Sequence, residues 1–408
     1  MTNEIKNVPE LRFPEFSSEW EENQLSKLTQ LLKDGTHGTH KDVENGAWLL
    51  SAKNIKNNNI IFDESDRKIS YDDYHKIYKN YQLQKNDLLL SIVGTIGHTA
   101  LVKDPINLAF QRSVAIIRFE NRLSNLFFLY LFQTHTFKKK LLRNQVVSAQ
   151  PGLYLGDLGK FFVNYPLNYK EQEKIGTFFN KLDQQIELEE QKLEKLEEQK
   201  KGYMQKIFSQ ELRFKDENGN DYPEWEDKLI SDIGKVVTGN TPSKKDNDYW
   251  NSNQYVWVTP TDISNKKNIY TSGYQLSQKG FSKARQLPKN TLLITCIASI
   301  GKNAILRIEG SCNQQINAVI PNDNYDVDYL YYAFEDVSKL MKSIAGKTAT
   351  QIVNKAVFEK LLLNVPIYEE QQKISGFLNK VDILIDKQTQ KIDELKLRKQ
   401  GFLQKMFV

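Results

Sequence analysis

Two polar loops, 33–46 (KDGTHGTHKDVENG) and 238–251 (TGNTPSKKDNDYWN), carry side chains suited to hydrogen bonding with a polyanion. Glycine lets the backbone approach a ligand closely, while Thr, Ser, Asn and Lys can donate to phosphate oxygens and base edges. Two further segments, 107–113 (NLAFQRS) and 311–318 (SCNQQINA), are rich in Gln, Asn and Arg. Gln and Asn can bond bidentately to adenine, and Arg to guanine, in the major groove of DNA. These segments therefore predict contacts with nucleic acid.

The candidate DNA-contacting residues lie in these segments and at equivalent places near them. For any one of them the alternative stays open that it only stabilises a turn or a buried polar network beside a sheet. The basic stretch 137–145 (FKKKLLRNQ) suits phosphates, but it equally suits an ordinary solvated helix end. The candidates are Gly35, Thr36, His37, Thr39, Lys53, Asn54, Gln111, Arg112, Asn240, Thr241, Ser243, Lys244, Lys245, Thr261, Lys302, Asn313, Gln314 and Gln315.

Sequence motifs for catalysis and for cofactor binding are missing. The chain has no glycine-rich phosphate motif, no HExxH, no paired CxxC and no Asn/Asp-Pro-Pro-aromatic motif of amino-group methyltransferases. His37 and His40 are three residues apart without a third ligand, and the carboxylates of 63–68 (DESDRK) are expected by chance in so charged a chain. We therefore predict no catalytic residue, no metal site and no cofactor bound by this chain, a pattern typical of a binding protein.

The chain repeats itself at an offset of about two hundred residues. Residues 171–208 align with 370–407 without a gap, and 17 of the 38 positions are identical. The motif ELRF precedes each globular part, at 10–13 and at 211–214, which suggests a circular arrangement in which the N-terminal stub resumes where the second helix stops. The globular parts have diverged far more than the helices, so something constrains the two helices alike and leaves the domains free to differ.

Both long helices carry apolar residues at alternating steps of three and four, which is typical of a coiled coil. Glu189 and Lys200 interrupt the first seam where Gln388 and Lys399 interrupt the second. We predict antiparallel pairing and, as a hypothesis for the register, that Glu189 faces Lys399; the alternative is that each helix is a solvated rod on its own domain. The predicted interface residues are Ile175, Phe179, Leu182, Ile186, Leu193, Leu196, Tyr203, Ile207, Ile374, Leu378, Val381, Ile385, Ile392, Leu395, Phe402 and Met406; Gly202 and Gly401 are expected to mark a bend or a close approach.

The globular parts mix short apolar strands with helices, so the predicted fold class is mixed α/β (α+β). Strands are expected at 87–94, 112–119 and 291–299, and helices at 123–143 and 328–344. The expected boundaries are an N-terminal stub at 1–14, a first domain at 15–167, a first long helix at 168–210, a linker with the second domain at 211–367, and a second long helix at 368–408.

Composition sets broad limits on the setting and the partners. The 408 residues exceed one core, and 39% hydrophobic residues suffice for packed domains. The net charge of +5 favours an anionic partner only mildly. Two cysteines, Cys296 and Cys312, cannot form a disulfide framework, and the sequence contains no signal-peptide core or membrane-length apolar run. We therefore expect a soluble, cytoplasmic protein.

The two EQ-x-KI helices, the DGTHGT loop (34–39), the segment CNQQINAVIP (312–321) and the duplicated plan together resemble the specificity subunits of type I restriction–modification systems. The resemblance covers the chain from about Glu10 onward, and its most specific part is the ungapped helix repeat combined with the domain motifs. It implies two target-recognition domains, each reading one half of a split double-stranded DNA sequence, and two antiparallel helices that set the spacing.

The same resemblance implies partners and cofactors. The helices are expected to dock two modification (methyltransferase) subunits, which bind S-adenosylmethionine and methylate adenine. Restriction (motor–nuclease) subunits, with ATP and Mg²⁺, are expected to join that complex, and this chain is expected to be non-catalytic and to bind none of these cofactors. Recognition domains of the family vary so much that no base-contacting residue can be transferred to this sequence.

Two other functions remain open from the residues alone. One is a coiled-coil scaffold that presents two ligand-binding modules to protein partners without DNA. The other is an autonomous nuclease or methyltransferase, which lacks every motif that it would need. Adenine methylation at a split sequence after co-expression with modification subunits distinguishes the first reading from the scaffold.

Overall fold

The computed structural model describes residues 7–146, 151–250, 252–263, 266–346 and 352–408. The chain forms two compact units: unit 1 comprises Met1–Gln191 and Thr389–Val408, and unit 2 comprises Lys192–Gln388. Each unit therefore holds one globular domain, a part of the first long helix and a part of the second. Residues 1–6 of the N-terminal stub and residue 251 of the second polar loop lie outside the described residues.

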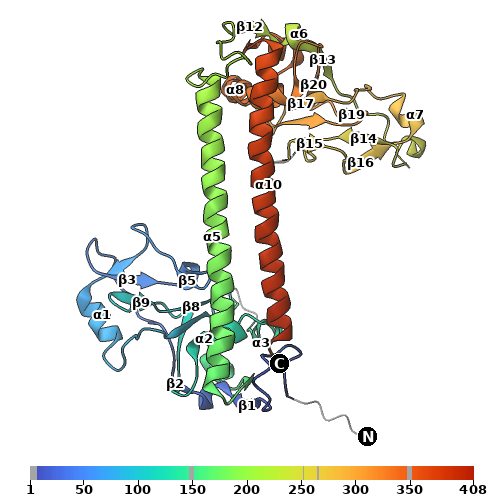
Figure 1. Ribbon diagram of the computed structural model, residues 1–408. Helices are drawn as coiled ribbons and strands as arrows, with labels where there is room; N and C mark the ends of the chain where they lie inside the picture. The colour runs from blue at the N-terminus through green and yellow to red at the C-terminus, as the bar shows by residue number, and fades with distance from the viewer. Residues whose placement is uncertain (1–6, 147–150, 251, 264–265, 347–351) are drawn as a thin grey trace. The chain divides into compact units, whose positions relative to one another are not determined.

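Unit 1 is a mixed α/β domain, as predicted (Figure 1). A four-stranded antiparallel sheet has the order β2–β10–β7–β8, and a three-stranded sheet has the order β6–β3–β9 with β3 and β9 parallel. Strand β1 pairs with β11, and β4 with β5. The strands are β1 (Glu21–Gln24), β2 (Thr29–Asp34), β3 (Ala47–Leu50), β4 (Ile55–Lys56), β5 (Asn59–Ile60), β6 (Lys68–Ile69), β7 (Leu88–Ser91), β8 (Thr99–Leu101), β9 (Leu108–Phe110), β10 (Val114–Phe119) and β11 (Phe162–Tyr165); the helices are α1 (Tyr71–Ile77), α2 (Asn125–Leu131), α3 (His135–Arg143) and α4 (Leu155–Gly159).

Unit 2 repeats this plan. Its five-stranded sheet has the order β13–β20–β17–β18–β15, and its three-stranded sheet has the order β16–β14–β19 with β14 and β19 parallel. Strand β12 pairs with β21. The strands are β12 (Glu226–Leu229), β13 (Gly234–Thr238), β14 (Tyr255–Val258), β15 (Asn268–Ile269), β16 (Tyr274–Leu276), β17 (Thr291–Thr295), β18 (Asn303–Leu306), β19 (Gly310–Cys312), β20 (Ile316–Pro321) and β21 (Leu362–Val365); the helices are α6 (Ile230–Ile233), α7 (Gln278–Phe281), α8 (Val327–Ala345) and α9 (Lys355–Phe358).

The central strands are apolar on both faces because each face has its own core. Leu88 and Leu90 of β7 pack among the helices of unit 1, whereas Leu89 between them packs with residues of the three-stranded sheet. In β17 of unit 2, Leu292 and Leu293 divide in the same way between two clusters. Side chains alternate along a strand, so two buried faces give a continuous apolar run rather than an alternating one.

One predicted helix is divided in the structure. The segment 123–143 was predicted as a single helix, but it forms α2 and α3, which are separated at 132–134. The Thr134 hydroxyl accepts a hydrogen bond from the backbone N–H of Phe137, which caps a new helix and ends the old one. The equivalent segment of unit 2 continues as the 19-residue helix α8.

The two long helices are α5 (Tyr169–Phe208) and α10 (Tyr368–Lys405), and they pair antiparallel, as predicted. In unit 1, near the start of α5, the Phe178 ring meets the Phe402 ring near the end of α10, with centroids 5.1 Å apart. In unit 2, Tyr203 near the end of α5 meets Phe377 near the start of α10, at 5.0 Å. These two ring pairs occupy matching positions of the repeat.

The core of unit 1 includes residues from both ends of the sequence. Phe407 packs against Trp20, Phe127 and Phe179, with ring centroids 6.2, 5.3 and 5.7 Å away. The backbone N–H of Leu11 donates to Lys405 O at 2.8 Å. The continuous chain of unit 2 makes the matching hydrogen bond from Leu212 N–H to Lys206 O, so the stub does resume where α10 stops.

Candidate nucleic-acid interface and helix pair

In unit 2 the polar loop after β13 lies directly on the turn between β19 and β20. The backbone N–H of Asn240 donates to Cys312 O at 3.0 Å, and the Thr241 hydroxyl donates to the Gln314 side chain at 2.6 Å. A Cβ at Gly239 would lie 2.2 Å from the carbonyl oxygens of Cys312 and Asn313. Only glycine fits there, which explains why the loop begins with this residue. Two of the predicted segments therefore form one loop cluster.

Unit 1 builds the same cluster from the matching segments. Thr36 N–H donates to Phe110 O at 2.7 Å, and Arg112 N–H donates to Thr36 O at 3.0 Å. A Cβ at Gly35 would lie 2.0 Å from Phe110 O and 2.4 Å from Gln111 O, so Gly35 is required for the close approach. The sequence placed these segments in equivalent positions, and the structure brings them together in both units.

Most of the remaining candidates are accessible to a ligand. Lys53 lies in the connection from β3 to β4, Thr261 in the connection from β14 to β15 and Lys302 in the turn from β17 to β18, rather than in the loop clusters. Thr36, Gln111, Asn240, Thr241 and Gln315 are half-buried. The exposed candidates are His37, Thr39, Lys53, Arg112, Ser243, Lys244, Lys245, Thr261, Lys302 and Gln314.

Asn54 and Asn313 are committed to turns instead. The Asn54 amide donates to Ile61 O and to Asp66, and its oxygen accepts from Ser51 N–H. Asn313 accepts from Gln315 N–H and donates to the Gln315 side chain. Both asparagines are buried, so their amides serve the turn, which was the alternative left open for each candidate.

The aromatic residues beside the unit 2 loop were not among the candidates. The Trp257 indole donates to Asn240 O at 3.0 Å and the Trp250 indole to Ser243 O at 3.1 Å, so two indoles hold the loop. Tyr274 is 55% exposed, and the Lys244 ammonium lies 5.7 Å from its ring centroid. The only signal in the sequence was the aromatic content of YVWV and YW, which is also typical of a core.

The charged and titratable groups of the loops serve mainly to fix them. His37 lies 2.5 Å from the Asp34 carboxylate, and His40 lies 2.9 Å from the Thr36 hydroxyl. The Lys53 ammonium lies 2.7 Å from Asp66. Hydrogen bonds from Lys53 and Asn54 lower the pKa of Asp66 from 3.8 to about 2, so this carboxylate is ionised at neutral pH.

The side chains offer no evident reactive centre within the described parts of the chain. No group of three His, Cys, Asp or Glu residues there could hold a metal ion. Cys296 and Cys312 are free and buried, and burial raises their pKa values to about 11 and about 12, so both thiols are protonated at neutral pH. None of the described helices combines the length and the apolar character that a membrane crossing needs.

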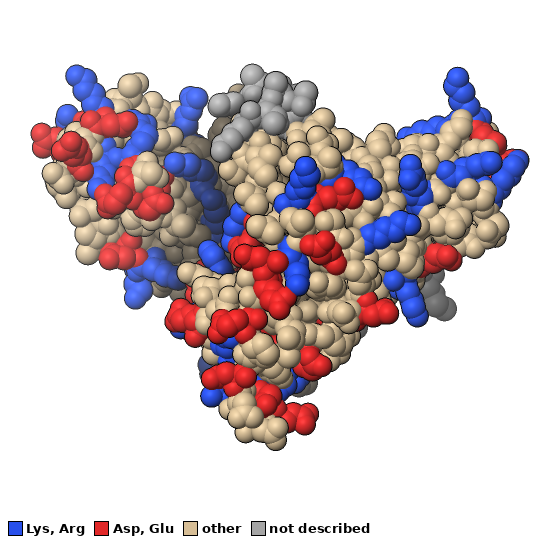
Figure 2. All heavy atoms as spheres, turned by 90° about the horizontal axis from the view of Figure 1, so that it is seen from above, with Lys and Arg blue, Asp and Glu red and all other residues tan. Residues whose placement is uncertain are grey.

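Basic and acidic side chains are interspersed on the face that Figure 2 shows. This mixture agrees with the small net charge of +5. The face shown in Figure 2 therefore offers local basic groups rather than one broad basic surface.

Each unit also contains a charged contact between the two long helices. In unit 1 the Lys399 ammonium of α10 lies 2.5 Å from Asp183 of α5 and 5.3 Å from the Tyr130 ring centroid. In unit 2 Lys200 of α5 lies 2.7 Å from Asp382 of α10. Its ammonium is 5.6 Å from the ring centroid of Tyr332, the equivalent of Tyr130. The polar interruptions at Lys200 and Lys399 are therefore ion pairs that match across the repeat.

The hypothetical register was wrong. Glu189 pairs with Lys391 rather than with Lys399, whose partner is Asp183. An apolar period of 3.5 residues looks the same after a shift of one heptad, so the seam alone could not select among registers. The predicted seam residues are buried or half-buried, except Tyr203, which is 38% exposed.

Gly202 and Gly401 have no steric requirement. A Cβ built on either residue would meet no heavy atom within 4 Å. The expected close approach is therefore absent at both positions, and both glycines lie inside continuous helices.

Comparison with known proteins identifies the family. The family model described as "Type I restriction modification DNA specificity domain" matches residues 17–198 and again residues 222–397. The chain belongs to this family. The two matches coincide with the two copies of the plan described above, so the specificity domain is present twice.

Two curated relatives of the family illustrate the similarity. The chain is 34% identical over 186 residues to the type I restriction enzyme MjaIX specificity subunit of Methanocaldococcus jannaschii, an alignment that covers 44% of this chain and 43% of the relative. It is 30% identical over 165 residues to the HindI specificity subunit of Haemophilus influenzae, covering 38% of this chain and 36% of the relative. Each alignment therefore spans less than half of the relative's length.

A solved structure resembles the whole chain. The type I restriction–modification S subunit from M. genitalium covers 98% of this chain, and 99% of that subunit is matched, with a TM-score of 0.63. The sequence identity is 14%. This likeness establishes the fold of a specificity subunit for the full length of the chain.

Proposed function

We propose that this chain is the DNA-specificity subunit of a type I restriction–modification complex and that each unit reads one half of a bipartite double-stranded DNA site. The observation that carries the proposal is the duplication. The family's specificity domain matches twice, and each copy builds a loop cluster from a Gly-Thr or Gly-Asn loop and a Gln-containing turn. Gln and Arg at such turns suit adenine and guanine edges, and the exposed lysines suit phosphates.

Within this proposal the side chains have separate tasks. Gln111 and Arg112 in unit 1, and Thr241, Gln314 and Gln315 in unit 2, face the bases. A second group contacts phosphates and sugars and so fixes the position of each domain on the duplex. This second group comprises His37, Thr39, Lys53, Ser243, Lys244, Lys245, Thr261 and Lys302.

The helix pair is the proposed spacer and docking surface. Two modification subunits, which carry S-adenosylmethionine and methylate adenine, dock on the helices, and restriction subunits with ATP and Mg²⁺ complete the complex. Exposed leucine and isoleucine side chains on both helices support such docking: Leu188 is 65% and Leu397 is 70% exposed in unit 1, and Ile383 is 51% and Leu384 is 53% exposed in unit 2. This chain itself contributes recognition and no catalytic group.

Mapping of adenine methylation tests the proposal. The chain is co-expressed with the modification subunits of its own system, and methylated positions are determined across the host genome. Methylation confined to one split sequence supports the proposal. Stable complexes that methylate nothing, or methylate without a common sequence, contradict it and favour a scaffold that binds only protein partners.

Exchange of one domain tests whether the halves are read independently. Residues 15–166 are replaced by the first domain of another family member with a different known target. One half of the methylated sequence is expected to change while the other half stays the same. A change in both halves would contradict independent reading.

Insertion of residues into α5 tests the spacer. Four residues added after Glu190 extend the helix by about 6 Å. The gap between the half-sites is expected to change, or methylation to be lost. An unchanged gap at full activity would show that the helix does not set the spacing.

A further inference from the structure

Both long helices present the same acceptors to their domains. Asn180 and Asp183 of α5 recur as Asn379 and Asp382 of α10, at the offset of 199 that relates the helix repeats. We name each of these two sets an acceptor pair. Because Asn is three residues before Asp, both side chains of a pair lie on one face of their helix.

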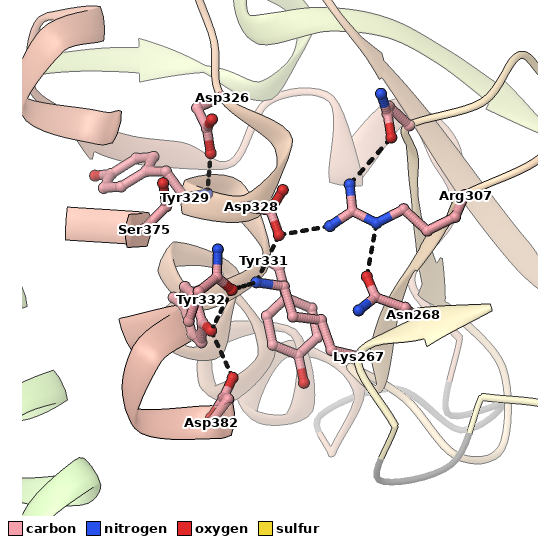
Figure 3. A network of polar contacts seen from close by, with 12 residues as sticks. Lys267, Asn268, Arg307, Asp326, Asp328, Tyr329, Tyr331, Tyr332, Ser375 and Asp382 are labelled. Atoms are coloured by element: carbon pink, nitrogen blue, oxygen red, sulfur yellow. Dashed lines mark hydrogen bonds and ion pairs between the residues drawn. The ribbon is translucent and has the colours of Figure 1, made fainter. Parts of the chain in front are cut away.

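In unit 2 the acceptor pair receives a lysine from the domain (Figure 3). The Lys267 ammonium donates to the Asn379 side-chain oxygen and lies 2.7 Å from Asp328 at the start of α8. It also lies 4.2 Å from the centroid of the Tyr332 ring, whose hydroxyl donates to Asp382 at 2.5 Å and lies 3.0 Å from the Asn379 side-chain oxygen. The Lys267 side chain is only 9% exposed, so this contact is enclosed by α8 and α10.

Neighbouring charges balance the buried lysine. Arg307 donates to the same Asp328 oxygen at 2.5 Å and to Asn268 at 2.6 Å. Burial alone would raise the pKa of Asp328, but the hydrogen bonds from Lys267 and Arg307 lower it from its ordinary value. The network in Figure 3 therefore joins the first residues of β15 to two helices through charged groups.

In unit 1 the equivalent residue is an asparagine. Asn58 directly precedes β5, as Lys267 directly precedes β15. Its amide donates to Asp183 at 2.7 Å, next to the Tyr130 hydroxyl, which donates to the same oxygen at 3.0 Å. The Asn58 oxygen accepts from Thr99 and Gln133, so this side chain is fixed on both sides. Where α8 has Asp328, α2 has the apolar Leu126, and a neutral donor suffices.

The anchored connection is also a recognition connection. Lys53 precedes Asn58 by five residues, and Thr261 precedes Lys267 by six. Both Lys53 and Thr261 are exposed candidates for DNA contact. A shift at the anchored end of so short a connection changes where its exposed residues lie on the duplex.

We infer that Asn58 and Lys267 are positioning residues. Each anchors its domain to the acceptor pair of a long helix, and thereby determines how strictly that domain discriminates its half-site. The part of this inference that concerns discrimination between DNA sequences rests on the proposed function. The helices supply constant acceptors, and each domain supplies a donor of its own. A different domain can therefore be anchored to the same helix if it has a hydrogen-bond donor at the position of Asn58 or Lys267.

Two variants and a control test the inference. Lys267→Met removes the donor of unit 2, and Asn58→Leu removes that of unit 1. In Lys267→Met the Asp328 carboxylate keeps Arg307 as its charge partner, so this variant is expected to fold. Lys289→Met removes an exposed lysine of unit 2 as the control.

The assembled complexes are assayed on the cognate site and on sites with one base pair changed in either half. Lys267→Met is expected to lower the ratio of cognate to substituted methylation rates about tenfold at one half-site only. The Tm of Lys267→Met is expected to stay near that of the parent. Asn58→Leu is expected to lower the ratio at the other half-site, and Lys289→Met to change neither.

Two outcomes overturn the inference. One is an equal fall of all rates with unchanged ratios, which indicates only a structural role; the other is a loss at both half-sites from one variant. If the parent complex methylates no common sequence, the proposed function fails instead. Hydrogen exchange in the free chain then decides the inference: faster exchange at 255–263 in Lys267→Met than in Lys289→Met supports it, and equal exchange overturns it.

Discussion

Unit 1 and unit 2 agree closely where they meet the long helices and differ where they carry the loop clusters. In unit 1 the Arg12 guanidinium binds both oxygens of the buried Glu171 carboxylate, at 2.7 and 2.8 Å, and the Trp20 indole donates to it at 3.2 Å. In unit 2 Arg213 and Trp225 bind Glu370 in the same way, at 3.2, 2.8 and 3.1 Å. In the loop clusters, by contrast, the two units share backbone hydrogen bonds between the loop and the turn but not the side-chain contacts.

This difference separates two kinds of constraint on one chain. The arginine, tryptophan and glutamate of these two contacts join each domain to a similar helix, so they repeat, whereas Asn58 and Lys267 share only their role as donors. Residues at the tips of the loops meet different ligand sequences under the proposed function, so they diverge.

The largest expected effect comes from the repeated arginine. Arg12→Ala leaves Glu171 buried without its charge partner, and Arg213→Ala does the same to Glu370, so each variant is expected to lose about 3–5 kcal/mol of stability. Hydrogen exchange should place each loss in the unit that carries the change. Arg122→Ala, which breaks an exposed pair with Glu120, is the control and should cost at most about 1 kcal/mol. Unequal losses from the two arginines would show that the seats are not equivalent.

A smaller effect is expected from the turns that diverge. Under the proposed function, Gln314→Ala in unit 2 and Arg112→Ala in unit 1 each remove an exposed group that faces the bases, and each should reduce discrimination at a different half-site by about 1–3 kcal/mol. Methylation rates on sites with single base-pair changes measure this loss. Chain stability should be unchanged, since neither side chain is buried. A loss of stability without a loss of discrimination would indicate that both residues have only a structural role.

The connection between β5 and β6 of unit 1 should respond to acid through Asp66. Its pKa is about 2 when folded and about 3.9 when unfolded, so the ionised form stabilises the fold. That contribution is fully present above about pH 4 and is lost as the pH falls towards 2. Asp66→Asn should cost about 1 kcal/mol at neutral pH, after allowance for solvent screening, and the difference from the parent should shrink below pH 4. Denaturant unfolding across this range measures it; a difference that does not change with pH would contradict the assignment.

The smallest effect tests the helices. Gly202→Ala and Gly401→Ala should each raise stability by up to about 1 kcal/mol, because alanine favours a helix and both sites have room for its methyl group. Thermal unfolding of the two single variants measures this gain, and the gains should be similar. A loss in either variant would indicate that the glycine meets something beyond this chain, such as a docked subunit.

Periodic features of the sequence predicted the fold well, whereas contacts between distant side chains were not predictable. The apolar seam that includes Ile175, Phe179 and Leu182 predicted the helix pair, because the spacing of apolar residues can be read from the sequence of a single helix. The register of the two helices depends on contacts such as the ion pair of Asp183 with Lys399. Such a contact between two helices cannot be predicted from the apolar period of either one. The Trp257 indole donates a hydrogen bond to the loop, although the neighbouring sequence indicated only a core strand.

The same reasoning explains what the sequence could and could not predict about the loop clusters. The Gly-Thr and Gly-Asn loops were singled out because their composition is unusual. Their glycines were expected to approach a ligand, but Gly35 and Gly239 approach the backbone of a neighbouring turn. Asn54 and Asn313 were chosen for their chemistry alone, but a short polar side chain can turn back to its own backbone. Lys267 was not chosen, because nothing in the sequence distinguishes a buried lysine from the exposed ones.

The position of Phe407 in the core of unit 1 has a consequence for synthesis. The ribosome makes 7–191 first, but that domain cannot complete its aromatic cluster until 389–408 has been made about two hundred residues later. Unit 2 is continuous in sequence and can close its own core in the meantime. The domain that is translated first is thus the last to finish, and during that interval its apolar surface around Trp20 and Phe127 is a natural target for chaperones.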